Sequence, residues 1–226
     1  MTKSQKIQIE DVSDEFEEIP VVSSTSESFD DEPMEEIPVG NFGRGFDRDK
    51  VQKALRGVSF GFGFFWRANF SKVDLSGADL SDLDLHAVNF QQAKLRGTNF
   101  RGSKLMGANF IGADLSEAIL DDADAHGCDM HGAKVSGASF RNASLVGANV
   151  SASDFSEVDF TGADIHAAKF LNSKLINAKL DGAKVRGVDF HAADLSGASF
   201  DNVQIHGTNF NGAKGVNTLN LKNSRY

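Results

Sequence analysis

A five-residue period runs from residue 67 to residue 214 of this chain, with no residue inserted or lost. Every fifth residue from Phe70 to Phe210 is apolar, and phenylalanine and leucine each supply 11 of these 29 central positions. The residue two places before a centre is usually small: alanine fills 17 of the 29 slots, and most of the rest hold valine, serine or threonine. A strict short period is typical of a solenoid, in which each turn of the chain stacks on the one before. Such a rod has sides and ends, so we consider surface partners before catalysis.

Each unit follows one pattern: a small residue, a polar residue, the apolar centre, a variable residue and often glycine. Residues 108–112 (Ala-Asn-Phe-Ile-Gly) and 193–197 (Ala-Asp-Leu-Ser-Gly) are clear examples, whereas residues 78–82 end in aspartate. Over about two-thirds of its length the chain resembles the pentapeptide-repeat family. The resemblance implies an all-β fold, a right-handed quadrilateral β-helix with four sides and 20 residues per coil. The frequent glycines would then lie at the corners.

A spacing of 20 residues sorts the centres into four columns and predicts about seven coils, or a rod ~35 Å long at ~4.8 Å per coil. Phenylalanine falls mostly into two opposite columns, one beginning at Phe70 and one that includes Phe100, while the other two are almost wholly aliphatic. Ala125 is the one undersized centre and lies beside Met130. A core filled in this way has no room for a ligand cavity.

The residue before each centre is predicted to point outward. In one column these residues alternate in charge from coil to coil: Asp74, Lys94, Asp114, Lys134, Asp154, Lys174 and Asp194. A basic belt, defined as Lys169, Lys174, Lys179 and Lys184, lies between acidic coils. We therefore expect these charges mostly to satisfy one another.

Composition divides the chain into four segments. They are a disordered acidic tail (residues 1–43), an N-terminal cap (44–66), the solenoid (67–215) and a polar C-terminal end (216–226). Residues 1–50 carry 14 acids and 5 bases, whereas residues 51–226 carry 18 of each, so the net charge of −9 comes from the tail. A segment so acidic and so poor in periodic apolar residues is typical of disorder. The aromatic residues that end the cap either cover the open end of the solenoid or form a docking patch.

The tail contains the sequence Glu-Glu-Ile-Pro-Val twice. The predicted partner-binding residues are Glu17, Glu18, Ile19, Pro20 and Val21 in one copy, and Glu35, Glu36, Ile37, Pro38 and Val39 in the other. Two copies of an acidic and apolar motif on one flexible chain are typical of a bivalent linear ligand. The alternative is a solubilising tail whose repeat arose by chance or duplication.

No residue set stands out from the repeat as a catalytic, cofactor or metal site. Cys128 fills a small slot and is interpreted as a buried apolar residue. Four histidines (His86, His126, His166 and His206) share one face but lie two coils, or ~10 Å, apart. Ligands of one metal ion must lie much closer than that. We therefore expect no enzyme, no cofactor and no metal.

The predicted function is a non-enzymatic, rigid scaffold for protein–protein binding in the cytoplasm, with a protein partner of unknown identity. The resemblance implies one alternative, because some members of the family act on DNA gyrase by mimicking DNA. A DNA-mimicking topoisomerase (gyrase) binder or protector needs a dense negative surface, which a neutral rod lacks. Acids that flank the basic belt disfavour direct nucleic-acid binding. No apolar run approaches the ~20 residues that span a bilayer, so no membrane partner is expected.

Overall fold

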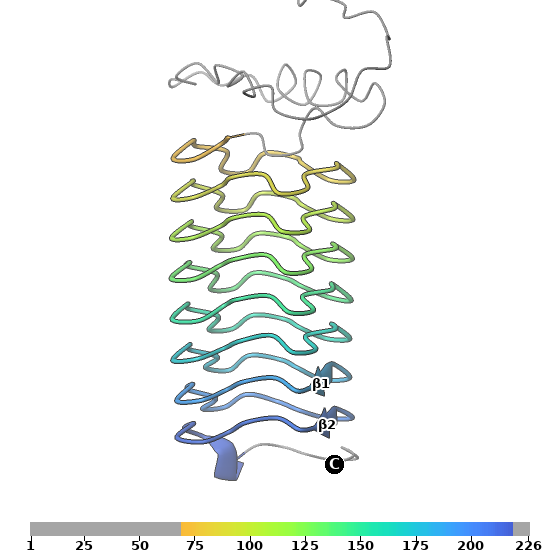
Figure 1. The fold of residues 1–226 in the computed structure, drawn as a ribbon, viewed down its shortest axis with the longest axis vertical. Coiled ribbons are helices and arrows are strands. Elements are labelled where there is room, and N and C mark those ends of the chain that lie inside the picture. Colours follow the sequence, from red (N-terminus) through yellow and green to blue (C-terminus); the bar gives the residue numbers. More distant parts are fainter. Residues whose placement is uncertain (1–68, 219–226) are drawn as a thin grey trace, which may run out of the picture. The chain divides into compact units, whose positions relative to one another are not determined.

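The computed structural model describes residues 69–218, which form a right-handed quadrilateral β-helix (Figure 1). Successive coils pair in parallel at a spacing of 20 residues, from Asn69↔Asn89 to Asp194↔Lys214. Most pairings involve one residue per side; the two longer segments are β1 (Lys184–Arg186) and β2 (Gln204–His206), which pair with each other. The 3-10 helix η1 (Val216–Thr218) follows the last coil. The predicted fold and its 20-residue coil are confirmed.

Each side of a coil ends in a β-turn. The N–H three residues after the centre donates to the carbonyl of the centre, as from Ala78 to Leu75 (2.9 Å). The second residue after every centre, from residue 72 to residue 212, has a positive φ, the pattern of a type II turn. Glycine holds 15 of these corners, and 14 hold another residue, such as Asn142 or Ala152. The corners therefore accept glycine without requiring it.

Backbone hydrogen bonds join each coil to both of its neighbours. Around one unit, Phe110 N–H donates to Asp129 O (2.6 Å), and Gly112 N–H donates to His131 O (3.0 Å), both in the next coil. Asp114 N–H donates back to Ala93 O in the preceding coil (3.0 Å). Because the same pattern recurs along the stack, the outward side chains project from a fixed frame.

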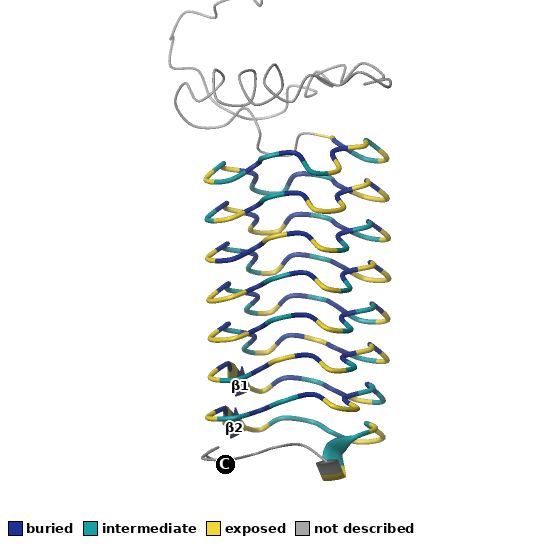
Figure 2. Ribbon diagram, turned by 180° about the vertical axis from the view of Figure 1, so that it is seen from behind, coloured by how far each residue is buried: buried dark blue, intermediate teal, exposed yellow. Residues whose placement is uncertain are grey.

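The interior of the stack is filled by the centres and by the small residues two places before them (Figure 2). Phe90 stacks on Phe70 (5.7 Å between ring centroids) and on Phe110 (5.1 Å), and meets Phe100 edge to face (5.7 Å). The rings thus form two columns that touch across the core, as the spacing predicted. Such packed aromatic pairs add stability beyond the area they bury.

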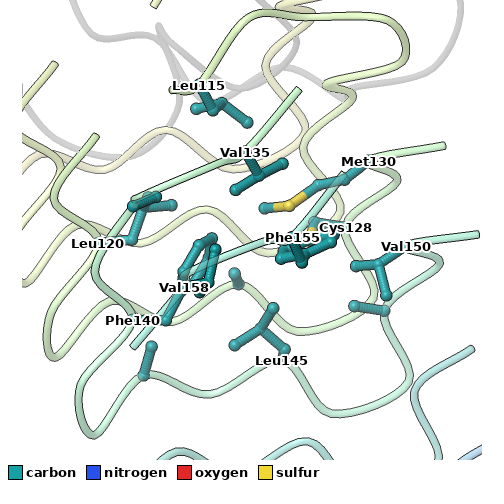
Figure 3. Close-up of a cluster of buried hydrophobic side chains, with 14 of the residues drawn as sticks. Leu115, Leu120, Cys128, Met130, Val135, Phe140, Leu145, Val150, Phe155 and Val158 are labelled. Atoms are coloured by element: carbon teal, nitrogen blue, oxygen red, sulfur yellow. The ribbon is translucent and has the colours of Figure 1, made fainter. Parts of the chain in front are cut away.

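The column of Phe70 loses its rings at Met130 and Val150. A phenylalanine from the adjoining side, Phe155, lies in this part of the core (Figure 3). Its ring contacts those of Phe140 (6.0 Å), Phe160 (5.6 Å) and Phe170 (5.6 Å). A large side chain on one side of the coil therefore compensates for a small one on the next, which keeps the core filled.

Hydroxyl side chains occupy some of the small inward slots. Thr98, Ser103, Ser153 and Ser173 are buried, and each donates to the carbonyl of a centre in the preceding coil (2.9, 2.6, 2.6 and 2.7 Å). Burying a hydroxyl is costly only when it lacks a partner. These slots therefore tolerate serine and threonine as well as alanine.

Candidate functional site

The partner-binding residues predicted in the tail, residues 17–21 and 35–39, lie outside the described residues, as do the predicted tail (1–43) and cap (44–66). The site that the structure describes is the outer surface of the coils. On each side this surface consists of two columns of side chains, one before the centres and one after them. Figure 2 shows these exposed and half-buried positions alternating with the buried centres along every coil.

Aspartate or asparagine before a centre binds the backbone of its own corner. Asp114 Oδ1 accepts from Ser116 N–H (3.1 Å) and from the Ser116 hydroxyl (2.6 Å), and Asn109 Oδ1 accepts from Ile111 N–H (3.0 Å). A short polar side chain that satisfies an N–H two residues on is the usual Asx-turn arrangement. The sequence analysis assigned these residues only an outward direction. The serine or threonine that often follows two places later was the signal for this second role.

These bonds also change the acidity of the aspartates. Hydrogen bonds from the side chain and the backbone of Ser196 lower the pKa of Asp194. Burial raises the pKa of Asp114, but the hydrogen bonds from Ser116 more than offset it, so that the pKa is lowered. The carboxylates at these corners are therefore held in their charged form.

At the units in which Ser139 and Ser199 stand before the centre, an aspartate from the preceding coil replaces the missing corner bond. Asp121 is almost buried, with 9% of its side chain exposed. It accepts hydrogen bonds from the Ser139 hydroxyl, from Arg141 N–H (3.1 Å) and from Arg101 (2.8 Å). Asp181 accepts from Asp201 N–H (2.9 Å) in the same way, and Asp201 directly follows the centre Phe200, which Ser199 precedes. Both aspartates therefore serve the fold.

One side of the coil stack, which we name the alternating face, carries the regular charge series predicted from the sequence. Its outward column runs Asp74, Lys94, Asp114, Lys134, Asp154, Lys174, Asp194 and Lys214, each residue paired with the next through the backbone. Lys94 lies 3.4 Å from Asp74, and Lys174 lies 3.7 Å from Asp154. Opposite charges therefore stack directly, as expected.

The histidine face carries His86, His126, His166 and His206. The first three pair through Nδ1 with the aspartate two residues before them: His86 with Asp84, His126 with Asp124 (2.7 Å) and His166 with Asp164 (3.5 Å). Met106, 45% exposed, stands between the first two histidines of this column. Among residues 69–218, no three side chains that could hold a metal ion gather.

The basic belt is only partly neutralised. Lys184 pairs with Asp164 (3.1 Å), and Lys174 pairs with Asp154 (3.7 Å). Asp159, the neighbour of Lys179 in the preceding coil, pairs instead with Arg141 (2.9 Å). In the described part of the chain, Lys169 and Lys179 form no ion pair. The expected mutual compensation therefore holds for two of the four lysines.

Cys128 is fully buried among the centres, as the sequence predicted. Burial, together with the charge of Asp129, raises the pKa of its thiol to about 12. The thiolate is the reactive form of cysteine. At neutral pH this side chain is therefore a small apolar filler.

Family models match most of the chain. The model of pentapeptide repeats matches residues 55–92, 65–102, 84–122 and 103–142, and the model of a pentapeptide repeat region matches residues 133–210. The chain belongs to the pentapeptide-repeat family. Comparison of this pentapeptide-repeat protein with curated proteins gave no match. No helix among residues 69–218 is long and apolar enough to cross a membrane.

Several solved structures are similar to the chain. HetL, a pentapeptide repeat protein involved in heterocyst differentiation regulation from the cyanobacterium Nostoc sp., is 26% identical, with 77% of this chain and 94% of HetL covered (TM-score 0.34). A pentapeptide repeat protein from the Arabidopsis thaliana thylakoid lumen is 28% identical, with 58% and 77% covered (0.38). QnrB1, a plasmid-mediated fluoroquinolone resistance protein, is 15% identical, with 70% and 93% covered (0.43). Similarity at this level carries no inference about function.

Proposed function

We propose that this protein is a non-enzymatic scaffold that binds protein partners, with the coils as a rigid platform and the doubled tail motif as the binding element. The observation that supports the platform is the fixed frame of residues 69–214. Every coil is hydrogen-bonded to its neighbours, and the corner bonds of residues such as Asp114 and Asn109 hold the outward side chains in place. A surface ordered before binding loses less entropy when a partner docks.

The doubled motif supports a bivalent mode of binding. Residues 17–21 and 35–39 begin 18 residues apart. A flexible link of that length would hold the copies about 23 Å apart on average. Two weak contacts at that separation strengthen each other, because the second forms within one complex.

The alternative function, DNA-mimicking binding or protection of gyrase, is disfavoured by charge. Residues 69–218 carry 13 lysines and arginines against 18 aspartates and glutamates. Duplex DNA of the same ~35 Å length carries roughly 20 negative charges with none of opposite sign. The described surface therefore has about a quarter of the net charge that a mimic needs, and it mixes both signs.

The test is affinity capture from the source cells followed by mass spectrometry. Four baits are compared: the full chain, a chain beginning at Gly45, and full chains with Ile19→Ala alone or with Ile19→Ala and Ile37→Ala together. The proposal expects a protein partner that the single variant captures weakly and that the double variant and the shortened chain lose. Capture that survives the double variant would reject the tail motif as the binding element, and recovery of gyrase by the shortened chain would favour the alternative.

A further inference from the structure

The alternating face differs from the other three sides in the regularity of its charges. Backbone pairing from Asp74 to Lys214 places eight outward residues in one column, and the sign changes at every step. On the histidine face, Ser144 and Gln204 interrupt the same alternation. On the side that begins at Asn69, most members of the column are uncharged.

Small side chains line the second column of the alternating face. Five of its seven members from residue 76 to residue 196 are serine: Ser76, Ser116, Ser136, Ser156 and Ser196. The other two are Arg96, which pairs with Glu117 at the corner (2.6 Å), and Ile176. Short side chains beside a charged column allow a second flat surface to approach closely.

The charges of this face are only partly neutralised within the chain. In the pair Lys94–Asp74 the two side chains remain 68% and 52% exposed, and in Lys174–Asp154 they remain 62% and 38% exposed. Each of these four charged side chains is therefore still open to a further partner of opposite sign. A partner that fits must present alternating charges at the ~4.8 Å coil spacing.

A second copy of the same chain presents such a column. When two copies meet face to face with their long axes antiparallel, a two-fold axis lying in the interface brings the charged column against itself. With the axis between Lys134 and Asp154, the facing pairs are Asp74 with Lys214, Lys94 with Asp194, Asp114 with Lys174, and Lys134 with Asp154. All four pairs are unlike in charge, and the symmetry repeats each of them once. A shift by one coil would place aspartate opposite aspartate.

We propose that the alternating face is a self-association surface that binds a second, antiparallel copy of this chain in that register. The face is about 35 Å long and roughly 10 Å wide, so each copy buries a few hundred Å². Stable complexes bury about 800 Å² per partner. The complex is therefore weak, forms at high protein concentration, and dissociates when salt screens its exposed charges.

Sedimentation equilibrium of the full chain tests the proposal over a series of protein concentrations at about 50 mM and about 500 mM salt. The variant Lys134→Asp with Lys174→Asp places like charges opposite each other at four points of the dimer. The control, Lys169→Asp with Lys179→Asp, makes the same charge change at equivalent positions on two other sides. Aspartate already occupies the outward position in several coils, so both variants should fold, and circular dichroism checks this.

We expect the wild-type mass to rise toward that of a dimer at low salt and to fall back at high salt. The control should behave likewise, and the alternating-face variant should dimerise at least about tenfold more weakly. A wild-type chain that stays monomeric at every concentration in low salt would refute the proposal. Equal weakening by the control and the test variant would refute it as well.

A mixing experiment tests the register. In a dimer of Asp114→Lys alone, the introduced lysine faces Lys174 of the other copy. In a dimer of Lys174→Asp alone, the introduced aspartate faces Asp114, so each variant by itself places like charges opposite each other. In a mixed dimer the lysine introduced at position 114 of one copy faces the aspartate introduced at position 174 of the other. The native Lys174 and Asp114 of the two copies also face each other. We expect the mixture to associate more strongly than either variant alone. A mixture no stronger than its components would reject this register.

Discussion

At the scale of single residues, the corners show that a backbone position with positive φ can be occupied by residues other than glycine. Left-handed backbone costs a residue with a side chain about 1–2 kcal/mol, yet 14 corners accept that cost. At many of the corners a side chain would meet open space: an added Cβ at Gly132 has no neighbour within 4 Å. Conformation alone, without steric conflict, therefore sets the preference for glycine there.

A matched pair of substitutions isolates this conformational term. Gly132 and Ala152 occupy the same corner in consecutive coils, with φ of 67° and 56°. Gly132→Ala should lower the free energy of unfolding by about 1 kcal/mol, whereas Ala152→Gly should leave it unchanged or raise it slightly. Urea unfolding followed by circular dichroism measures both. Similar losses in the two variants would show that the corner backbone is not the cause.

The phenylalanine columns predict a much larger effect. Phe110 is fully buried and contacts the rings of Phe90 and Phe100. Phe110→Ala should cost about 3–5 kcal/mol, because the surrounding coils cannot close the cavity. Met106→Ala, at an exposed position of a neighbouring unit, is the control and should change stability by less than about 0.5 kcal/mol. Comparable thermal unfolding of the two variants would contradict the assignment of the core.

At the scale of the coil side, many corners are bonded by an aspartate or asparagine before the centre, and two are bonded by an aspartate of the preceding coil. The five-residue period revealed the outward position of residues such as Asp114. It did not reveal that Asp121 supports the corner that follows Ser139, because the two are 18 residues apart and occupy different positions of the repeat. Only the stacking of coils brings the two residues together, so the pattern within a single five-residue unit does not show this contact.

Substitution of Asp121 tests this replacement. Asp121→Ala removes the acceptor of Arg141 N–H and the partner of Arg101, and should cost about 1.5–3 kcal/mol. Asp121→Asn keeps an acceptor for the N–H and should cost less. Denaturant unfolding of both variants gives the comparison. If alanine cost no more than asparagine, the bond to Arg141 would contribute nothing to stability.

At the scale of the whole molecule, the architecture was predictable from the five-residue period together with the resemblance to a known repeat family. The inward centres and the small slots follow from the five-residue period. The 20-residue coil was implied by the resemblance to the pentapeptide-repeat family, and the ring columns follow from that coil. The repeat pattern could not show that Phe155 compensates for Val150 on the next side, or that Lys169 forms no ion pair within residues 69–218. Both features depend on which of several neighbouring side chains each residue contacts.

Acid should destabilise the whole stack. Burial opposes the shift, but hydrogen bonds from Ser116, Ser156 and Thr161 leave the pKa values of Asp114, Asp154 and Asp159 below 3.8. The unfolded chain therefore binds protons before the folded chain does. The stabilisation that these three carboxylates contribute is complete above the pKa of a carboxyl in the unfolded chain. It is lost as the pH falls through the lowered pKa values of the folded chain.

Urea midpoints measured between about pH 7 and about pH 3 should show this decline on the acid side. Ser116→Ala with Ser156→Ala removes two of the hydroxyl donors and should make the decline shallower. An unchanged pH profile in that variant would exclude these hydroxyls as the source.

The strict alternation of charge on one side limits how such a chain can grow. Duplicating a single coil of 20 residues would keep the core in register but would set aspartate on aspartate, or lysine on lysine, in the column from Asp74 to Lys214. Duplicating two coils would preserve both the core and the charges. An insertion that preserves both the core and this charge column must therefore be a multiple of 40 residues, which is also the spacing of His86, His126, His166 and His206.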